Sequence, residues 1–586
     1  MRPSRKRITR RLPNFATKSN GFRASVSRIS AAPYIGLRRS HLSSTDMQAS
    51  VARIPFTDLH GFSALFRDYC TNYEALSDYF AGDWSRSGER ASAVERAAAF
   101  DRDRDALADA LLRQHATWGD GEAARAGIEA LREPDTAAVV TGQQVGLFTG
   151  PIYTILKALS AIQLADRLAE ETGRRIVPVF WLGGEDHDVD EISRVVALQS
   201  NRPVELRLQA DEAGLPGPAG RIRPGNGITD RLEGLLPDTD FKGDVLRMVR
   251  QAYGAGATLS EGFARMLRAL FPCLVIINPD DAALKRLAAP LFAREIEEAE
   301  TAAALVRRVS DELGQTYHEQ VFVRPANLFL LNEQGRIPLD LDGEDFVERG
   351  TGRRMTRAEA LELLQRAPES FSPNVVLRPL MQDLLLPTAL YVGGPGEIAY
   401  FAQCHPLYEW AGLPMPLIYP RAGATFLEPH VAKVLDTYGL AVGDFAGDAD
   451  RLFHRVVVDS MQGDIEEAFD EAARLLGGVV DQVRAPLREV DGTLAKAADA
   501  TQKALTTELA RLRAKAVRAE KKKQDLVRAR LEKAQGNLYP NGVLQERELS
   551  VLHFLNKYGM GFVDLLRETL DTDTAEHQVV RLQGGG

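Results

Sequence analysis

"AAVVTGQQVGLFTGPIYTILKALSAIQLADRLAEETGRRIVPVFWLGG", residues Ala137 to Gly184, contains the alternation of elements that decides the fold. An apolar run at Ala137–Thr141 and the run "RRIVPVFWLGG" flank a stretch with the apolar spacing of a helix. Neither run alternates polar and apolar residues, as is typical of parallel strands that are covered on both faces. Strand, helix and strand at this length predict a right-handed βαβ unit.

The segment between the two runs is predicted to be an amphipathic helix. Pro151 suits its first turn, because the N–H that proline lacks would be unpaired there. Gly173 is predicted to end it, since glycine readily adopts the left-handed conformation of a helix C-terminus. The apolar stripe of the helix comprises Ile152, Ile155, Leu156, Leu159, Ile162 and Leu168.

Similar patterns extend this core along the chain. Residues 60–133 are rich in helix formers, "PCLVIINP" (Pro272–Pro279) indicates a further buried strand, and a long helix is expected after it. "VFVRPANLFLLNEQGRIPL" predicts a hairpin, and "LPTALYVGGPGEIAYFAQ" predicts a strand, a glycine turn and a helix. The predicted fold class is therefore α/β, a Rossmann-like parallel sheet core over residues 47–422 with insertions at about 200–260.

The C-terminal region, residues 423–586, is predicted to be helical. An apolar seam with spacings of four, three, four and three residues indicates a coiled coil. The seam comprises Leu505, Leu509, Leu512, Ala516 and Ala519. We place the coiled coil at about 458–535 and a compact returning segment at 536–576. A helical hairpin that packs on its own domain is one interpretation, and self-association into a homodimer is the favoured one.

Residues 1–46 are predicted to be disordered and to lie outside the fold. They carry eleven Lys or Arg and a single acidic residue, Asp46. This is the composition of an organellar transit peptide, or of a basic arm for nucleic acid. Alternatively the start is mis-assigned, because Met47 follows directly and "MQASVARIPFTDLHGFSALFRDY" reads as a globular beginning. The sequence leaves these three interpretations open.

Composition argues against several classes of protein. Residues 47–586 carry 61 basic and 80 acidic side chains, a net charge of −19, which disfavours nucleic acid as the main partner. The sequence has no run of eighteen apolar residues, so we expect no membrane-spanning helix. Cys70, Cys273 and Cys404 lie far apart and form no CxxC pair, which fits a reducing, cytoplasmic compartment better than a disulfide framework.

The first candidate site is the loop "TGQQVGLFTGP", between the first predicted strand and helix. Open α/β sheets bind ligands at such strand ends, and free N–H groups at a helix start favour an anion. The loop matches neither the dinucleotide motif nor the P-loop, and Lys157 falls two turns into the helix, so a plain tight turn is an equal alternative. The predicted substrate- or nucleotide-binding residues are Gly142, Gln143, Gln144, Gly146, Thr149 and Gly150. The adjacent amides of Gln143 and Gln144 favour binding.

The second candidate is "GGEDHDVDE", directly after the second strand. Two carboxylates 4 Å apart repel by about 4 kcal/mol at an effective dielectric constant of 20, so five within seven residues need solvent or counter-cations. The predicted catalytic residues, which would handle an amine or its proton, are Asp186, His187 and Asp188, and the alternative is a solvated loop in which Asp188 or Asp190 caps a helix. Glu185 is predicted to bind substrate, and Mg²⁺ is an alternative ligand of this loop, whereas a single histidine excludes a zinc cluster. Asp190 and Glu191 are predicted to begin a helix at "EISRVV".

The third candidate is "YVGGPGEIAY", Tyr391–Tyr400. Glycines around a proline, followed by a helix from Glu397, predict a second concavity lined by N–H groups. Arg378 and Arg421 are each candidates for a bidentate grip on a carboxylate or phosphate, although an ion pair within the fold is the commoner role of a lone arginine. The predicted binding residues here are Asn374, Arg378, Gly393, Gly394, Gly396, Glu397 and Arg421.

Four blocks of this sequence together carry a resemblance to a known family. They are "VVTGQQVGLFTGPIYTILKALSAIQLA", "PVFWLGGEDHDVDEI", "SPNVVLRPLMQDLLLPTALYVGGPGEIAYFAQ" and "LYPNGVLQER". In this order they resemble the bacillithiol-biosynthesis cysteine-adding enzyme family (BshC, cysteine ligase). The resemblance covers Met47 to about Glu576, and the basic extension stands outside the family pattern.

The resemblance implies a fold and an activity. It implies a Rossmann-like core similar to nucleotidyltransferases and class I synthetases, inserted connecting segments, and a C-terminal coiled coil that forms a homodimer. The implied reaction is the last step of bacillithiol biosynthesis, in which a cytoplasmic ligase joins cysteine to the amine of glucosaminyl-malate. ATP is expected to activate the cysteine carboxylate, and Mg²⁺ is a further candidate.

Two points stay open beside this resemblance. The sequence has no literal HIGH tetrapeptide, which is a motif of the class I synthetases. Whether the cysteine carboxylate is activated by adenylyl or by phosphoryl transfer is therefore undecided. The alternative function is a non-catalytic, nucleotide-binding scaffold that dimerises through its coil.

Overall fold

The core of the protein is a five-stranded parallel sheet in the order β13-β12-β2-β3-β6. Its strands are β2 (Ala137–Gln144), β3 (Ile176–Gly183), β6 (Val275–Ile277), β12 (Thr388–Gly393) and β13 (Leu417–Pro420). The computed structural model describes residues 48–119, 121–185, 192–209, 217–225, 227–254, 256–333, 335–460 and 465–583. The predicted Rossmann-like parallel core is confirmed.

The βαβ unit forms as its apolar pattern predicts. Residues 137–140 of β2 and 179–182 of β3 are buried, and α5 (Tyr153–Thr172) connects the two strands. Gly173 ends α5 with a φ of 68°, which favours glycine. The helix begins two residues later than predicted, because Pro151 forms an isolated β-bridge with Ser550 instead of entering the first turn.

The order of the strands defines where a ligand is expected. From β2 the chain proceeds to β3 and β6 on one side, whereas β12 and β13 add to the other side. The border between β2 and β12 is therefore the topological switch point, and sheets of this kind bind ligands outside the carboxyl ends of the strands at that point. The helices α5 and α13 (Pro395–Ala411) begin after β2 and β12, respectively.

Further helices and a second sheet surround this core. The predicted N-terminal helices are α1 (Ala64–Thr71), α2 (Ser87–Ala99), α3 (Arg104–Trp118) and α4 (Glu122–Ala130). The predicted long helix is α10 (Ala282–Leu313), and it is followed by α11 (Arg357–Arg366) and α12 (Arg378–Leu385). An antiparallel sheet comprises β7 (Leu328–Asn332), β8 (Gly335–Asp342), β9 (Asp345–Glu348), β10 (Arg354–Met355) and β11 (Phe371–Pro373). Its β7–β8 pair is the predicted hairpin.

The insertion after β3 corrects one prediction. A helix was expected to begin at Asp190 and Glu191 and to continue through "EISRVV". Asp190 and Glu191 lie outside the described residues, so that start stays a prediction, but from Arg194 on the chain is strand β4 (Arg194–Gln199), which pairs antiparallel with β5 (Arg202–Arg207). Ser200 and Asn201 form the two-residue connection with φ values of 52° and 60°. Both residues in the left-handed region give the tight turn whose twist matches a β-hairpin. The helices α7 (Gly227–Leu235), α8 (Lys242–Ala252) and α9 (Leu259–Leu270) follow.

The C-terminal region is not purely helical, which corrects a second prediction. A three-stranded sheet, in the order β1-β15-β14, joins its two ends to the start of the described chain. Its strands are β1 (Gln48–Ile54), β14 (Gly423–Leu427) and β15 (His577–Gln583). The helices between are α14 (Pro429–Tyr438), α15 (Ala449–Ser460), α18 (Gln545–Glu548), α19 (Val551–Tyr558) and α20 (Gly561–Thr569).

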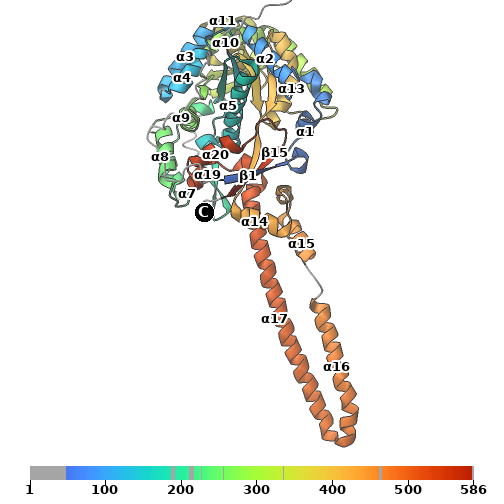
Figure 1. The fold of residues 1–586 in the computed structure, drawn as a ribbon. Helices are drawn as coiled ribbons and strands as arrows, with labels where there is room; N and C mark the ends of the chain where they lie inside the picture. Colours follow the sequence, from blue (N-terminus) through green and yellow to red (C-terminus); the bar gives the residue numbers. More distant parts are fainter. Residues whose placement is uncertain are drawn as a thin grey trace, which may run out of the picture. The chain divides into compact units, whose positions relative to one another are not determined.

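The predicted coiled coil is a hairpin of two long helices, α16 (Ile465–Val490) and α17 (Gly492–Leu538), which run side by side (Figure 1). The last turns of α17 belong to the main core, where Leu531, Ala534 and Leu538 are buried. Leu505 and Leu512 of the predicted seam are 40% and 56% exposed within the single chain. Residues 1–46, predicted to be disordered, lie outside the described residues.

Candidate functional site

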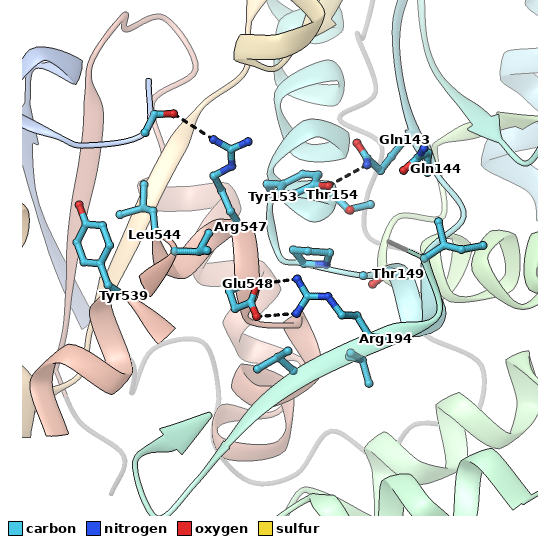
Figure 2. Close-up of a pocket in the computed structure, with 18 of the residues that line it drawn as sticks. Gln143, Gln144, Thr149, Tyr153, Thr154, Arg194, Tyr539, Leu544, Arg547 and Glu548 are labelled. Carbon is cyan, nitrogen blue, oxygen red and sulfur yellow. Dashed lines mark hydrogen bonds and ion pairs between the residues drawn. The ribbon is translucent and has the colours of Figure 1, made fainter. Parts of the chain in front are cut away.

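Two cavities lie at the carboxyl ends of the parallel strands. The first has a volume of about 470 Å³ (Figure 2), and the second, at the switch point, has a volume of about 820 Å³. Both cavities are lined by Gln143, Gln144, Tyr153 and Arg547. The two spaces are therefore neighbours that share part of one wall.

The structure brings most predicted binding residues to one of these cavities. The second cavity is lined by Gly142, Gln143, Gln144, Glu185, Asn374, Arg378, Gly394, Gly396, Glu397 and Arg421. The first is lined by Gln143, Gln144, Gly146, Thr149 and Gly150. Gly393 ends β12 without lining either cavity. The predicted catalytic residues Asp186, His187 and Asp188 lie outside the described residues, so their role stays a prediction.

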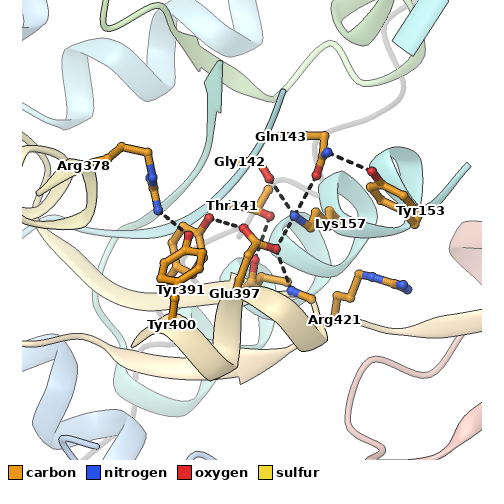
Figure 3. A network of polar contacts seen from close by, with 12 residues as sticks. Thr141, Gly142, Gln143, Tyr153, Lys157, Arg378, Tyr391, Glu397, Tyr400 and Arg421 are labelled. Atoms are coloured by element: carbon orange, nitrogen blue, oxygen red, sulfur yellow. Dashed lines mark hydrogen bonds and ion pairs between the residues drawn. The ribbon is translucent and has the colours of Figure 1, made fainter. Parts of the chain in front are cut away.

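A buried lysine at the base of the second cavity holds the ends of β2 and β12 together (Figure 3). The Lys157 ammonium forms an ion pair with Glu397 and donates to the Gly142 carbonyl at 2.8 Å and to Gln143 Oε1 at 3.0 Å. Tyr391 donates its hydroxyl to Glu397 Oε1 at 2.6 Å. The network fixes the loop ends around the cavity with all three lysine protons engaged.

Burial and charge act in opposite directions on this pair. Burial lowers the pKa of Lys157, and the neighbouring Glu397 carboxylate offsets part of that effect. Burial alone would raise the pKa of Glu397, but Lys157, Tyr391 and the Gly394 N–H hold it below its usual value. Glu397 is therefore ionised at neutral pH and is committed to its internal partners.

The backbone amides of the glycine turns have internal acceptors. The Gly394 N–H donates to Glu397 Oε2 at 2.7 Å, so a carboxylate already occupies the position at the start of α13 where an anion was expected. In the first loop the N–H groups of Gly146, Thr149 and Gly150 donate to backbone carbonyls, and the Phe148 N–H donates to the Tyr253 hydroxyl. These turns therefore offer few free N–H groups to a phosphate.

Gly142 has a packing role that its motif did not reveal. It lies inside β2, and a Cβ there would approach the Trp181 carbonyl oxygen at 3.0 Å and the Tyr391 hydroxyl at 3.5 Å. A larger residue would separate β2 from its neighbours at the switch point. Close approach within the sheet thus favours glycine at this position, and the predicted binding role of Gly142 stays a prediction.

The two predicted arginines differ in what holds them. Arg421 is buried and forms a bidentate ion pair with Glu546, at 3.1 and 2.5 Å. Arg378 is half-buried and donates to two neutral groups, Gln382 Oε1 at 3.0 Å and the Tyr400 hydroxyl at 2.8 Å. Arg421 therefore has the internal ion pair that a lone arginine commonly makes, whereas Arg378 forms no ion pair with a carboxylate of the described residues.

Glu185, the last described residue before the acidic loop, also has a lysine partner. It is buried and forms an ion pair with Lys285 of α10, which also donates to the Phe371 carbonyl at 2.6 Å. Both acidic residues that line the second cavity in the described chain, Glu185 and Glu397, are thus neutralised by lysines. Sequence reasoning missed both lysines, although Lys157 among the apolar residues of α5 was a signal.

The described lining of the second cavity is strongly basic. Its basic residues are Lys157, Arg324, Arg336, Arg378, Arg421 and Arg547. Arg336 donates to Ser372 Oγ at 3.0 Å and to the Pro373 carbonyl at 2.7 Å, and its guanidinium lies over the Phe329 ring. With the lysines and Arg421 paired, Arg324, Arg378 and Arg547 are lining cations that form no ion pair with a carboxylate of the described residues. A ligand with carboxylate or phosphate groups fits this lining.

The first cavity presents unpartnered hydroxyl groups. Thr149 and Thr154 are fully buried, and neither Oγ1 has a hydrogen-bond partner among the described residues. Arg194 donates to both carboxylate oxygens of Glu548, at 2.7 and 3.0 Å (Figure 2). Buried hydroxyls without partners are costly, and a ligand in this cavity would reach these two only after a local rearrangement that uncovers them.

Neither a metal-binding cluster nor a membrane-spanning helix is found among the described residues. No group of three or more His, Cys, Asp or Glu side chains in the described residues has a geometry that would hold a metal ion. Within the same residues, no helix combines the length and the apolar character of a membrane span.

Comparison with known proteins gives the family. The model of the BshC N-terminal Rossmann-like domain of bacillithiol biosynthesis matches residues 49–422, and that of the BshC C-terminal coiled-coil domain matches residues 424–582. The chain belongs to the BshC family. The BshC models together span both the parallel sheet and the α16–α17 hairpin.

Individual BshC relatives match over most of their length. A protein of Salinibacter ruber named "Putative cysteine ligase BshC" is 49% identical over 535 residues, 90% of this chain and 98% of the relative. A protein of the same name from Chlorobaculum tepidum is 35% identical, over 90% of this chain and 98% of the relative. A crystal structure of a putative arginyl-tRNA synthetase from Campylobacter jejuni covers 71% of this chain and 94% of its own, with 10% identity and a TM-score of 0.21, from which nothing follows.

Proposed function

We propose that this protein joins the carboxyl group of cysteine to the amine of glucosaminyl-malate and so forms bacillithiol, with ATP activating the carboxylate. The observation that carries the proposal is the charge of the second cavity, where Arg378 lines the ligand space and has no carboxylate partner among the described residues. The malate part of the acceptor bears carboxylates, which arginine binds through its planar fork of donors. The relatives' name, cysteine ligase, supports the same reaction class.

The second cavity is the proposed site of the glucosaminyl-malate and cysteine. Its volume of about 820 Å³ accommodates both small molecules side by side. Arg336 and Arg378 approach from β8 and α12, and Arg324 lies between α10 and β7. Holding the malate with these side chains would fix the sugar amine relative to the cysteine carboxylate, which is the main contribution of positioning to a two-substrate reaction.

The first cavity is the proposed site of the nucleotide. Its buried Thr149 and Thr154 hydroxyls lack hydrogen-bond partners among the described residues, and ribose and base atoms would supply them once a local rearrangement uncovers the hydroxyls. Gln143 and Tyr153 line both cavities, so a nucleotide bound here would lie next to the acyl acceptor proposed for the second cavity. ATP supplies the energy for the amide bond by forming an acyl-adenylate or an acyl-phosphate. The amine then displaces that leaving group and gives up one proton, for which His187 with its neighbouring aspartates remains the predicted acceptor.

We further propose that two copies associate through the α16–α17 hairpin. Leu475, Val479 and Val483 follow one another at intervals of four residues on α16 and are 56%, 60% and 49% exposed. Residues spaced by four lie on one face of a helix, so these three side chains form an exposed apolar stripe that a second helix would cover. Residues this apolar are seldom left in a row on the surface of a monomer.

The ligase proposal is tested by combining the purified protein with cysteine, ATP and glucosaminyl-malate. Mass spectrometry is expected to detect the thiol-containing amide, formed with loss of one water. AMP with pyrophosphate would indicate adenylyl activation, and ADP with phosphate would indicate phosphoryl activation. Glucosamine without malate serves as the matched acceptor control. Absence of the amide, with nucleotide binding intact, would overturn the ligase in favour of a nucleotide-binding scaffold.

A further inference from the structure

Arg547 stands at the border between the two cavities and lines both of them. Its side chain is exposed, and Nη1 donates to the Gly61 carbonyl at 3.3 Å (Figure 2). No carboxylate of the described residues forms an ion pair with it. A guanidinium has five N–H donors, so most of the hydrogen-bonding capacity of Arg547 is available to a ligand.

The residues on either side of Arg547 are fixed, one toward each cavity. Glu546 holds Arg421 of the second cavity and also accepts from the Ala424 N–H at 2.7 Å. Glu548 holds Arg194 of the first cavity. The short helix α18 is therefore anchored through ion pairs on both sides, and the Arg547 side chain extends from a fixed backbone.

The remaining polar part of α18 is anchored as well. Gln545 clamps β14, because its Oε1 accepts from the Phe426 N–H at 2.7 Å and its Nε2 donates to the Phe426 carbonyl at 3.0 Å. The same Nε2 donates to the Asn537 carbonyl at the end of α17. Three of the four residues of α18 thus have internal partners that hold the helix, and Arg547 is the exception.

We propose that Arg547 is a binding residue shared by the two cavities, which contacts a phosphate of the nucleotide in the first and a carboxylate of the substrate in the second. This inference rests on the proposed function. Joining the two ligands brings two anionic groups together, and a cation at their border reduces the repulsion between them. Because its neighbours α18 and Tyr153 are held in place, the guanidinium alone needs to reorient toward either ligand.

The test is to measure ADP binding and glucosaminyl-malate binding separately, by calorimetry, on the full chain. Arg547→Gln removes the charge and leaves a polar amide. We expect it to lower the affinity for each ligand about tenfold, which is the lower end of the loss expected for a charge-assisted hydrogen bond. Arg547→Lys keeps the charge but lacks the planar, forked donors of the guanidinium, and it is expected to recover part of the affinity for both ligands.

Matched variants separate a shared residue from a general effect. Thr154→Val removes a hydroxyl that lines the first cavity only, so it is expected to weaken ADP alone. Arg378→Gln alters the second cavity only and is expected to weaken glucosaminyl-malate alone. Arg125→Gln changes the same charge at an exposed position that lines neither cavity, and both affinities are expected to stay unchanged.

The outcomes distinguish this inference from the proposed function. Loss of affinity for both ligands in Arg547→Gln, with neither lost in Arg125→Gln, supports the shared contact. Unchanged affinity for one or both ligands in Arg547→Gln overturns it and leaves the ligase proposal intact. Failure of the unmodified protein to bind either ligand contradicts the proposed function itself, and the shared contact with it.

Discussion

Arg378 and Arg421 line the same cavity, yet they are held in opposite ways. Arg421 is buried against Glu546, and this ion pair neutralises its charge within the fold. Arg378 is half-buried and has Gln382 and Tyr400 as partners, both of which are neutral. The position of an arginine in a cavity therefore does not define its role, and the charge of its partners does. Arg421 organises the wall, whereas Arg378 is free to compensate a ligand anion.

The largest expected effect comes from removing the buried ion pair of Arg421. Arg421→Gln leaves Glu546 buried without its cation, and we expect it to lower the free energy of unfolding by about 3–5 kcal/mol. Chemical denaturation measures this loss. The double variant Arg421→Gln with Glu546→Gln is expected to recover most of the stability. If the single variant has the same free energy of unfolding as the unmodified protein, the ion pair between Arg421 and Glu546 does not stabilise the fold.

A second prediction concerns Glu295, which is connected to Arg378 by hydrogen bonds through the neutral residues Asn327 and Asn374. Glu295 Oε1 accepts from the Asn327 N–H at 2.8 Å, and Asn374 Nδ2 donates to Asn327 Oδ1 at 2.8 Å. The Asn374 carbonyl in turn accepts from the Arg378 N–H at 2.9 Å. Burial raises the pKa of Glu295 to about 8, so the carboxyl group is protonated in the folded protein at neutral pH.

This raised pKa makes stability depend on pH. The folded state binds the proton of Glu295 more tightly than the unfolded state, so its stabilising contribution is complete below pH 4.5 and is lost progressively as pH rises to about 8. At pH 7 the loss amounts to about 3 kcal/mol. Glu295→Gln is expected to remove this dependence and to stabilise the protein at pH 7 to 9. Identical pH profiles of stability for the two proteins would show that Glu295 is ionised in the fold.

The third prediction concerns Arg378 and its proposed contact with a ligand anion. Arg378→Gln is expected to raise the KM for glucosaminyl-malate by about ten- to a hundredfold, the range for a hydrogen bond to a charged group, while Tm changes little. Steady-state kinetics and thermal unfolding of the same preparation measure both quantities. A large fall in Tm would instead assign Arg378 a structural role like that of Arg421.

The smallest effect on the cavity is expected from a change far along the chain. Val479→Glu places a charge in the exposed apolar stripe of α16 and is expected to convert the dimer to a monomer, with little effect on the Tm of the chain itself. Analytical ultracentrifugation measures the mass. Lys503→Glu, a charge change at an exposed position of α17, is the matched control. A monomeric unmodified protein would contradict the proposed self-association.

Much of the core could be predicted from sequence because its signals are local. The run from Ala137 and the run before Gly184 are apolar without alternation, and α5 shows a helical stripe between them. By contrast, β15 pairs with β1 and β14, which lie more than a hundred residues away in sequence, so nothing next to it indicated a strand. The β4–β5 hairpin was predictable in principle, because Ser200-Asn201 suits a tight turn.

The candidate site could be predicted as a set of loops, but not as a set of charges. The glycine turns, Arg378 and Arg421 were found because motifs and strand ends are visible in the sequence. Their partners were not, since Lys157, Lys285 and Glu546 approach from other elements and acquire meaning only when the chain is folded. This is why the sequence suggested phosphate-binding amides, whereas the folded chain offers arginine side chains.

The measurement that tests the account most directly is acceptor preference, expressed as kcat/KM for glucosaminyl-malate relative to glucosamine. The unmodified protein is expected to prefer the malate conjugate by about tenfold or more, because Arg378 binds its carboxylate. Arg378→Gln is expected to lose most of that preference while retaining its fold. An unchanged preference in this variant would contradict the assignment of the arginine-lined cavity as the acceptor site.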